Sequence, residues 1–584
     1  MRFALIFAAL ILGACQTTGP AAGPEPGVAA LHELFDQSWE RRLRENPTMA
    51  SNMGDLRYND QWPDDSLAAI EASHAETVAE LARLEAIDRG ALPPTERLNY
   101  DLFKRQLEGS IEGFQYRNFL IPLNQRGGVQ SLHTMTETLR LQNAKHYADW
   151  ITRLSKLGTV VDQNIALMRM GIDEGRVHPR VIMERIPAQI EVQLVDAPEQ
   201  SPFFEPFAEF PDSISPADRE RLTAEARTVI ADVVIPAYER FHAFFVGEYL
   251  PASRTDVGAW SLPDGRAFYA SRAKRFTTTD LTPDEIHEIG LSEVARIRAS
   301  MQDVMREVGF GGSFDEFLTH LRTDPQYYYD TPEALFDAYL AASKRIDPLL
   351  VDLFGKLPRM PYGLRPIPAA IAPDTTTAYY SRPAGDGTRA GYYYVNLYRP
   401  EVRPKYEIVA LSLHEAVPGH HLQIALSQEL GDLPMFRRMG GFTAFTEGWG
   451  LYAEHLGEEM GLYEDPLDKF GQLTYEMWRA VRLVVDTGMH HKEWTREQAI
   501  DFFMDNAAKS EADIINEIDR YIAWPGQALA YKIGELKIKE LRARAEQRLG
   551  DRFDVRAFHD KLLENGAIPL DVLEREIDGW IATQ

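Results

Sequence analysis

The sequence predicts a mainly helical protein with one small β-hairpin. Two observations support the helices: apolar residues recur at helical spacing through most of residues 31–250, and again from Tyr406 to the C-terminus. A third observation supports the hairpin, because only residues 376–381 and 392–397 form convincing runs of aromatic and β-branched residues. The sequence therefore belongs to the mainly α class, with a local β element ahead of its C-terminal helices.

The N-terminus resembles the signal segment of a bacterial lipoprotein. Residues 1–14 read as a signal peptide, since the apolar run Phe3–Leu12 is too short to span a bilayer. The segment ends in Leu-Gly-Ala-Cys, so Cys15 is expected to be the lipidated first residue, followed by a flexible tether over 15–28. The alternative is a plain signal peptide with an incidental cysteine. By the same resemblance, Gln16 suggests a periplasm-facing lipoprotein of the outer membrane.

Composition excludes several classes of protein. The chain of 584 residues carries 88 acidic and 62 basic side chains, for a net charge of −26, which argues against nucleic acid and anionic lipid surfaces as partners. The lipid on Cys15 is then the expected membrane contact. One cysteine permits neither an intrachain disulfide nor a multi-cysteine metal site. The length allows two lobes, which we expect at roughly residues 29–255 and 256–584 of a helical domain spanning 29–584.

Each expected element has a local reason in the sequence. Pro283 with Asp284 and Glu285 is typical of a helix N-terminus. The hairpin is expected at 375–398, around the turn residues Gly385-Asp386-Gly387, and residues 357–373 are expected to be extended. The expected helical stretches are 31–39, 70–87, 93–111, 132–170, 216–249, 283–308, 314–321, 332–354 and most of the chain after residue 406.

The segment Ala410–Ile424 holds a dense cluster of ligand and base chemistry. His414 and Glu415 are adjacent, and His420 and His421 follow, whereas a zinc-peptidase helix carries His-Glu-x-x-His. On an unbroken helix His420 would lie about 120° around from His414, and His421 roughly 10 Å further along, so neither would reach the same ion. The segment is either an expanded zinc site or a kinked core helix with incidental histidines.

Pro418 and Gly419 favour the expanded site. Pro418 has no N–H to donate to the carbonyl of His414, and its ring crowds that carbonyl, so an ordinary helix is broken there. Gly419 permits conformations that other residues resist. We therefore expect a local bulge that returns a displaced histidine to the metal, with Glu415 beside the bound water as the base.

A third ligand is expected from a later helix. A zinc hydrolase needs three protein ligands and an open position. Glu447, in Thr-Glu-Gly-Trp-Gly-Leu-Tyr-Ala-Glu, lies 33 residues after His414. Glu454 is two turns further on the same face and is expected to support the ligands. The alternative for Glu447 is a solvated helix acid.

A second Pro-Gly break occurs at Pro525-Gly526. Pro525 lies four residues after Tyr521 and frees that residue's carbonyl. Polar residues surround this break, and a tyrosine phenol is a suitable donor to an oxyanion. The candidates are Arg520, Tyr521, Gln527 and Tyr531, with His490 and His491 as weaker ones.

Three motifs together resemble one bacterial family. They are His-Glu-Ala-Val-Pro-Gly-His-His-Leu-Gln, Thr-Glu-Gly-Trp-Gly-Leu-Tyr-Ala-Glu and Arg-Tyr-x-x-x-Pro-Gly-Gln-Ala-Leu-x-Tyr, and they resemble the family called domain of unknown function 885, many of whose members are lipoproteins. The resemblance spans roughly residues 29–581. It implies a two-lobed, zincin-like metallopeptidase, similar in its helical build to angiotensin-converting enzyme, thimet oligopeptidase and thermostable carboxypeptidases.

The resemblance also implies roles for single residues. His414, His420 and Glu447 would bind Zn²⁺, with His421 as an alternative ligand, and Glu415 would be the catalytic base. Tyr521 would stabilise the oxyanion, because Arg520-Tyr521 is similar to an Arg-Tyr pair of angiotensin-converting enzyme. The strand 392–397, which carries Tyr394, resembles the edge strand on which such enzymes lay their substrate. Arg520, Gln527 and Tyr531 complete the expected substrate contacts.

The function expected from these residues is zinc-dependent hydrolysis of short peptides by a lipid-anchored periplasmic protein. The alternative is a non-catalytic lipoprotein that binds peptides or envelope components, with a vestigial or structural metal site. A hydrolase acting on other amides or esters is a third reading. The sequence leaves the cleavage position, the choice between His420 and His421, and the oligomeric state open.

Overall fold

The computed structural model describes residues 26–584 except 370–371, 386, 388 and 432. The expected signal peptide, Cys15 and residues 16–25 of the expected tether lie outside the described residues, whereas residues 26–28, also expected in the tether, begin a helix. The helices before the sheet are α1 Pro26–Glu45, α2 Pro47–Met53, α3 Leu67–Glu85, α4 Pro94–Phe114, α5 Ala144–Ser155, α6 Leu157–Asp173, α7 Arg180–Met183, α8 Ile186–Glu191, α9 Pro216–Val229, α10 Ile235–Phe244, α11 Leu250–Ala252, α12 Gly265–Thr277, α13 Pro283–Glu307, α14 Phe314–Thr323, α15 Pro332–Ile346 and α16 Leu350–Leu353.

The sheet and the helices after it make up the rest of the fold. The strands are β1 Tyr362–Pro366, β2 Ala378–Ser381 and β3 Gly391–Val395. They are followed by α17 Ile408–Glu415, α18 His420–Glu429, α19 Met435–Arg438, α20 Thr443–Glu459, α21 Pro466–His490, α22 Arg496–Met504, α23 Glu511–Ala523, α24 Ala530–Leu549, α25 Val555–Leu563 and α26 Leu570–Thr583. The prediction of a mainly helical chain with a small β element is confirmed.

Most expected helices are present, and one is divided. The helix at Pro283 begins with a complete capping box, in which Thr282 and Glu285 each accept from the other's backbone N–H. The helical stretch expected over 132–170 is present in three pieces. A 3₁₀ helix at Val129–Glu137 comes first, and the separate helices α5 and α6 follow it.

The expected hairpin is confirmed, but it is part of a larger sheet. β2 pairs antiparallel with β3, with Tyr379 opposite Tyr394. β1, which lies in the segment 357–373 expected to be extended, pairs parallel with the other side of β3. The strand order is therefore β1-β3-β2, and β3 is central. The expectation that strand 392–397 is the edge strand is wrong, since β2 occupies the edge.

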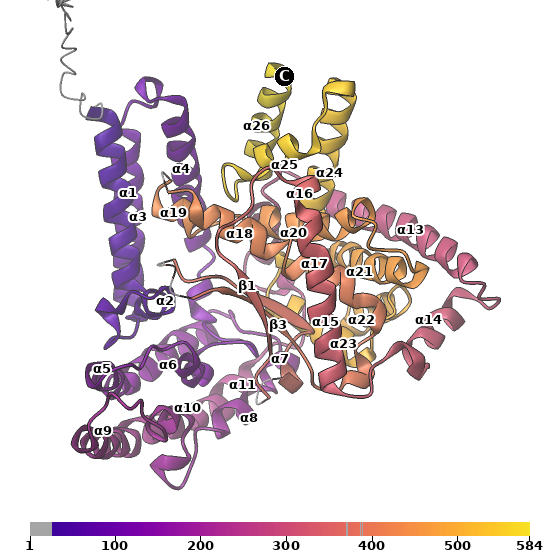
Figure 1. Ribbon diagram of the computed structural model, residues 1–584. Coiled ribbons are helices and arrows are strands. Elements are labelled where there is room, and N and C mark those ends of the chain that lie inside the picture. Colours follow the sequence, from indigo (N-terminus) through magenta and orange to yellow (C-terminus); the bar gives the residue numbers. More distant parts are fainter. Residues whose placement is uncertain (1–25, 370–371, 386, 388, 432) are drawn as a thin grey trace, which may run out of the picture.

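Packing connects the two halves of the chain. Figure 1 shows α1, α3 and α4 standing side by side apart from α24–α26, with α5–α11 below them and the sheet in the middle of the view. One hydrophobic cluster contains Trp150 and Tyr238 from the N-terminal half together with Tyr393 and Trp478 from the C-terminal half. The core thus crosses the boundary expected near residue 255, and the division into lobes stays a prediction.

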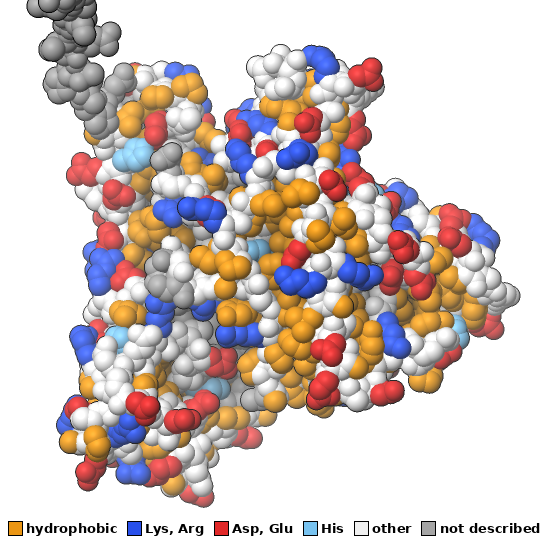
Figure 2. Space-filling view, viewed as in Figure 1, with side chains coloured by type: hydrophobic (Ala, Val, Ile, Leu, Met, Phe, Trp, Pro, Cys, Tyr) orange, Lys and Arg blue, Asp and Glu red, His pale blue; other side chains and the backbone are white. Residues whose placement is uncertain are grey.

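Helix α21 is the central buried helix of the C-terminal half. Every side chain from Phe470 to His490 is buried, and the helix packs along α13 and against α17. A helix buried on all sides must satisfy its charged residues internally. No helix within the described part of the chain combines the length and apolar character needed to cross a membrane. Figure 2 shows acidic and basic side chains interspersed with hydrophobic ones over one face of the molecule.

Candidate metal centre and its cavity

The expected helix break lies between α17 and α18. Helix α17 ends at Glu415, and α18 begins at His420, with a cis Val417–Pro418 peptide bond between them. The carbonyl of Pro418 accepts a hydrogen bond from Trp449 Nε1 at 2.8 Å, which anchors the break to α20. A Cβ at Gly419 would overlap the carbonyl oxygen of His414, so only glycine fits this close approach of the backbone.

The break brings two histidines and a glutamate together. The Nε2 atom of His420 lies 3.5 Å from Glu447 Oε2, and the Nε2 atom of His414 lies 3.9 Å from the same oxygen. One ligand atom from each of the three residues lies within 4.8 Å of the other two. Ligands about 2 Å from a shared ion would have separations close to these, so the arrangement fits a zinc-sized ion.

Helix α20 supplies the third candidate ligand and a support for the first. Glu454, two turns after Glu447, places Oε1 2.7 Å from His414 Nδ1. A carboxylate in that position orients the imidazole and leaves Nε2 available for a metal. Gly450 lies between the two glutamates, and a Cβ there would sit 2.8 Å from His414 Cε1. The expectation that Glu454 supports the ligands agrees with this contact.

Burial and neighbouring charges tune these groups. Burial lowers the pKa of His414 well below its ordinary value, and the charge of His420 adds to the effect. Burial also acts to lower the pKa of His420, but its pairing with Glu447 outweighs burial and raises the pKa. Burial raises the pKa of Glu454 to about 8, while the nearby charge of Arg479 acts in the opposite direction and favours the carboxylate that accepts from His414. A neutral His414 is the form in which a histidine binds a metal.

Glu415 lies beside the ligands at the end of α17. Its side chain lines the same cavity as His414, His420 and Glu447 and is 9 % exposed. Burial raises its pKa to about 6, and the nearby carboxylate of Glu447 contributes in the same direction. A carboxylate next to a metal position with a pKa near neutrality is suited to general-base work.

A cavity of about 280 Å³ opens above this cluster. Five helices supply most of its walls, namely α17, α18, α20, α21 and α23, together with the first turn of α24. The edge strand β2 and a turn in the N-terminal half complete them. The lining residues are Arg126, Thr376, Thr377, Ala378, Tyr379, Tyr380, Leu411, His414, Glu415, His420, Glu447, Tyr475, Trp478, Arg479, Arg482, Glu517, Arg520 and Tyr531.

His421, the alternative ligand, points away from the cluster. Its Nδ1 lies 2.8 Å from the hydroxyl of Tyr380, and its Nε2 lies 2.9 Å from the carbonyl oxygen of Met360. Both ring nitrogens are therefore engaged, and neither is available to an ion. His421 instead ties α18 to the segment carrying β1, and the geometry favours His420 over His421.

Tyr521 does not line the cavity, contrary to the expected oxyanion role. Its buried hydroxyl donates to Glu517 Oε2 at 2.7 Å and accepts from Trp478 Nε1 and Arg482 Nε. A phenol has one proton, and here a carboxylate takes it. His490 also belongs to this buried network, because its Nε2 lies 3.0 Å from the carbonyl oxygen of Tyr521.

The expected substrate contacts divide into two groups. Arg520 and Tyr531 line the cavity. Gln527 is buried behind Arg520 and accepts from its Nη1 at 2.6 Å. Tyr394, on the central strand, stacks on Tyr379 of the edge strand with ring centroids 4.8 Å apart. Gln527 and Tyr394 thus do not line the cavity themselves, but each contacts a side chain that does, Arg520 and Tyr379 respectively.

Sequence reasoning missed the arginines of α21. Arg479 and Arg482 are one turn apart, both 5 % exposed, and both line the cavity. Arg479 Nη2 lies 3.6 Å from Oε1 of Glu454, the residue that contacts His414, and this ion pair links α21 to α20. The available signal was the pair of arginines one turn apart within residues 477–485, a run that is otherwise apolar. Charged side chains are rarely buried in such a run unless a partner or a ligand balances their charge.

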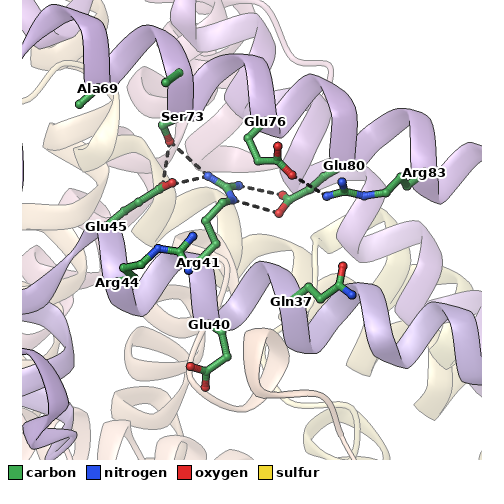
Figure 3. Close-up of a pocket in the computed structure, with 11 residues that line it drawn as sticks. Gln37, Glu40, Arg41, Arg44, Glu45, Ala69, Ser73, Glu76, Glu80 and Arg83 are labelled. Carbon is green, nitrogen blue, oxygen red and sulfur yellow. Dashed lines mark hydrogen bonds and ion pairs between the residues drawn. The ribbon is translucent and has the colours of Figure 1, made fainter.

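A second, larger groove lies elsewhere and differs in character. It has a volume of about 670 Å³ and runs between α1 and α3, lined on both sides by charged side chains. Figure 3 shows Arg41 reaching Glu45 and Glu80, and Arg83 reaching Glu76. These pairs satisfy one another, and the groove holds none of the ligand candidates.

The comparisons with known proteins concern family and fold. The chain is similar to a structure described as "the putative lipoprotein from Colwellia psychrerythraea", at 29 % identity and a TM-score of 0.90, over 96 % of this chain and 100 % of that one. It also shares its fold with a "putative lipoprotein of unknown function from Shewanella oneidensis", at 17 % identity and a TM-score of 0.73, over 93 % and 99 %. No curated protein matches the chain.

A family model covers nearly the whole sequence. The model described as "Bacterial protein of unknown function (DUF885)" matches residues 47–577. This match includes the break at Pro418, the helix with Glu447 and the second Pro-Gly break, which are the segments that build the cavity. The chain therefore belongs to the DUF885 family of bacterial proteins.

Proposed function

We propose that this protein is a zinc-dependent peptidase that hydrolyses short peptides at the cavity above His414, His420 and Glu447. One observation carries the proposal: ligand atoms of these three residues lie within 4.8 Å of one another on the wall of an open cavity. Two imidazoles and one carboxylate are a donor set typical of catalytic zinc, and three protein ligands leave one position for water.

The surroundings of the ligands fit a metal better than a kinked core helix. The support from Glu454 to His414 Nδ1 is the outer hydrogen bond that metal-binding histidines usually have. A structural histidine pair would be expected to satisfy its own ring nitrogens, as His421 does. When bound, zinc would polarise a substrate carbonyl and make a water molecule more acidic.

The protein's own residues would then carry the proton and hold the substrate. Glu415 would take the proton of the attacking water and pass it to the departing amine. The outer edge of β2 lines the cavity at Ala378, Tyr379 and Tyr380, and it would offer backbone groups to an extended peptide. Tyr531 replaces Tyr521 as our choice of oxyanion donor, because it lines the cavity and its hydroxyl makes no hydrogen bond to a described residue.

The test is the variant Glu415→Gln, assayed on a peptide library with and without chelator and read by mass spectrometry. We expect a loss of at least about 100-fold in kcat, which is the usual scale for a general base, with bound zinc unchanged. Glu464→Gln, at an exposed glutamate between α20 and α21, is the matched control and should keep wild-type activity.

Two outcomes would contradict the proposal. Hydrolysis by Glu415→Gln at the wild-type rate would remove Glu415 from the mechanism. Purified protein that lacks stoichiometric zinc, and that gains no activity when zinc is added, would favour a binding lipoprotein with a vestigial site instead.

We further propose that the protein is anchored to the cell envelope through a lipid on Cys15. The Leu-Gly-Ala-Cys box supports this, as does the description of the Colwellia psychrerythraea relative as a lipoprotein. Outer-membrane retention, facing the periplasm, follows from Gln16. Cys15→Ser should abolish labelling with radioactive palmitate and release the protein into the soluble envelope fraction, and retained labelling would exclude this anchor.

A further inference from the structure

The cavity has a second chemical feature besides the candidate metal ligands, namely a concentration of arginine. Four arginines and three glutamates line it, in a protein whose net charge is −26. Two of those glutamates, Glu415 and Glu447, belong to the candidate metal centre. The third, Glu517, accepts from Arg482 Nη2 at 3.0 Å and from Arg520 Nη2 at 2.9 Å. The wall away from the metal ligands is therefore rich in positive charge.

Arg482 is only partly satisfied by the protein. Its Nε donates to Tyr521 and its Nη2 to Glu517, but its Nη1 is buried without a hydrogen-bond partner among the described residues. The residue is 5 % exposed, and its guanidinium lies 4.3 Å from the ring centre of Tyr531. A buried charged N–H without a partner is costly, so its retention beside a cavity points to a ligand that accepts from it.

Arg126 provides a second unsatisfied guanidinium from a different part of the chain. It lines the cavity, is exposed to solvent, and makes no side-chain hydrogen bond or ion pair with a described residue. Its turn is closed by hydrogen bonds between Asn124 and Gly127 in both directions. The Gln125 amide fastens the turn to the carbonyl of Asp519 at 3.0 Å. A fixed turn thus presents a free cation beside Arg520.

We propose that Arg126 and Arg482 form a subsite for a carboxylate of the substrate, in the same cavity as the candidate metal centre. A carboxylate matches a guanidinium in shape and charge and accepts two parallel hydrogen bonds from it. The positive wall favours an anion, and the aromatic rings of Trp478 and Tyr531 lie against the Arg482 guanidinium and shield that side of the contact from bulk water. The role of this subsite in substrate selection rests on the proposed peptidase function, whereas carboxylate binding can be measured independently of it.

Two sources of this carboxylate are possible, and they give different enzymes. The α-carboxylate of a peptide would make the protein act near the C-terminus of its substrate. An acidic side chain would make it select for Asp or Glu instead. Three matched fluorescent peptides separate these sources: a free acid with a neutral C-terminal residue, its C-terminal amide, and an amide whose last residue is Glu.

The experiment measures equilibrium binding of the three peptides to the Glu415→Gln protein, so that no peptide is consumed. We expect the free acid to bind at least about 10-fold more tightly than its amide, the scale of one charge-assisted hydrogen bond. Arg126→Gln should remove most of this preference. Arg44→Gln, an exposed arginine on α1, is the control and should keep it. Tight binding by the Glu-ended amide instead would assign the subsite to an acidic side chain.

The subsite and the proposed function can fail separately. Equal binding of all three peptides, or an unchanged preference in Arg126→Gln, would overturn the subsite even if wild-type protein hydrolyses peptides. A clear carboxylate preference in a protein that hydrolyses nothing would uphold the subsite and reject the peptidase. If both hold, cleavage products of the free acid should be short C-terminal fragments, and the amide should be cut at least about 10-fold more slowly.

Discussion

The two Pro-Gly breaks look alike in the sequence but do different things in the fold. At the first, Pro418-Gly419, the Pro418 carbonyl accepts a hydrogen bond from Trp449, and the side chains of His414 and His420 line the cavity. At the second, Pro525-Gly526, the Gly526 N–H donates to Asp486 and the Tyr521 hydroxyl donates to Glu517. The comparison teaches that a Pro-Gly pair shows only where a helix is interrupted. Side chains that face a cavity and lack hydrogen-bond partners within the protein show where chemistry can occur.

The largest effect is expected from a methyl group at the first break. Gly419→Ala would place Cβ on the carbonyl oxygen of His414, which is backbone and cannot move aside without displacing the ligand. We expect a loss of about 3 kcal/mol or more in the free energy of unfolding, together with loss of bound zinc. Urea unfolding and metal analysis measure the two effects.

Gly431→Ala is the matched control for that substitution. Gly431 follows the end of the same helix α18 and has open space around its Cα. Its stability should change by no more than about 0.5 kcal/mol. If Gly419→Ala bound zinc and unfolded like this control, the first break would not be holding the ligands.

A pH-dependent effect is expected at the second break. Burial raises the pKa of Asp486 to about 7 from 3.8, against hydrogen bonds from Tyr269 and Gly526 that lower it. Between these two values the folded protein holds a proton that the unfolded chain has lost, so this group reduces the free energy of unfolding as pH rises. The side chain of Asp486→Asn does not titrate, so its free energy of unfolding should not fall in this way. The difference between the variant and wild type should therefore shift by about 2 kcal/mol in favour of the variant from pH 5 to pH 7.

Urea unfolding of wild type and Asp486→Asn at several pH values measures that difference. Asp501→Asn, on the exposed face of α22, is the control and should run parallel to wild type. A constant difference between Asp486→Asn and wild type across this range would mean that Asp486 does not hold a proton in the folded state.

The smallest effect is expected from Gly526→Ala. Gly526 has a φ of +82°, and the nearest atom to an added Cβ is Arg272 Cβ at 3.1 Å. The left-handed backbone should cost about 1–2 kcal/mol, without the direct clash expected at Gly419. Thermal unfolding measures the cost, and zinc content should stay at the wild-type level. Loss of zinc here would show that both breaks support the same centre and would end the distinction between them.

The sequence could predict whatever depends on local pattern. The helical class, the hairpin and the break at Pro418 follow from periodicity, turn residues and the chemistry of proline. Glu447 was accessible because the site needed a third ligand from a later helix. The parallel partner β1 was not, since a five-residue strand rich in Gly, Arg and Pro carries little local signal and is paired only through tertiary contact.

The site residues that sequence reasoning missed or misplaced are those whose role depends on where the side chain points in the fold, which the residue type alone does not reveal. Tyr521 and Tyr531 were both candidates, but which hydroxyl reaches the cavity depends on how α23 and α24 are rotated around the second break. Arg126 lies nearly 300 residues before His414 in the chain. Only the folding of its turn against α23 brings it to the cavity.

The free edge of β2 has a further consequence, for self-association. An unpaired strand edge is a template on which a second chain can add, and proteins usually block such edges with charge, proline or a covering segment. Among the described strands β2 pairs with β3 alone, and its residues Ala378, Tyr379 and Tyr380 line the cavity. Because this edge faces a cavity of about 280 Å³ and not a flat outer surface, it is recessed as an edge covered by another segment would be, and we expect it to be protected from edge-to-edge aggregation for the same reason.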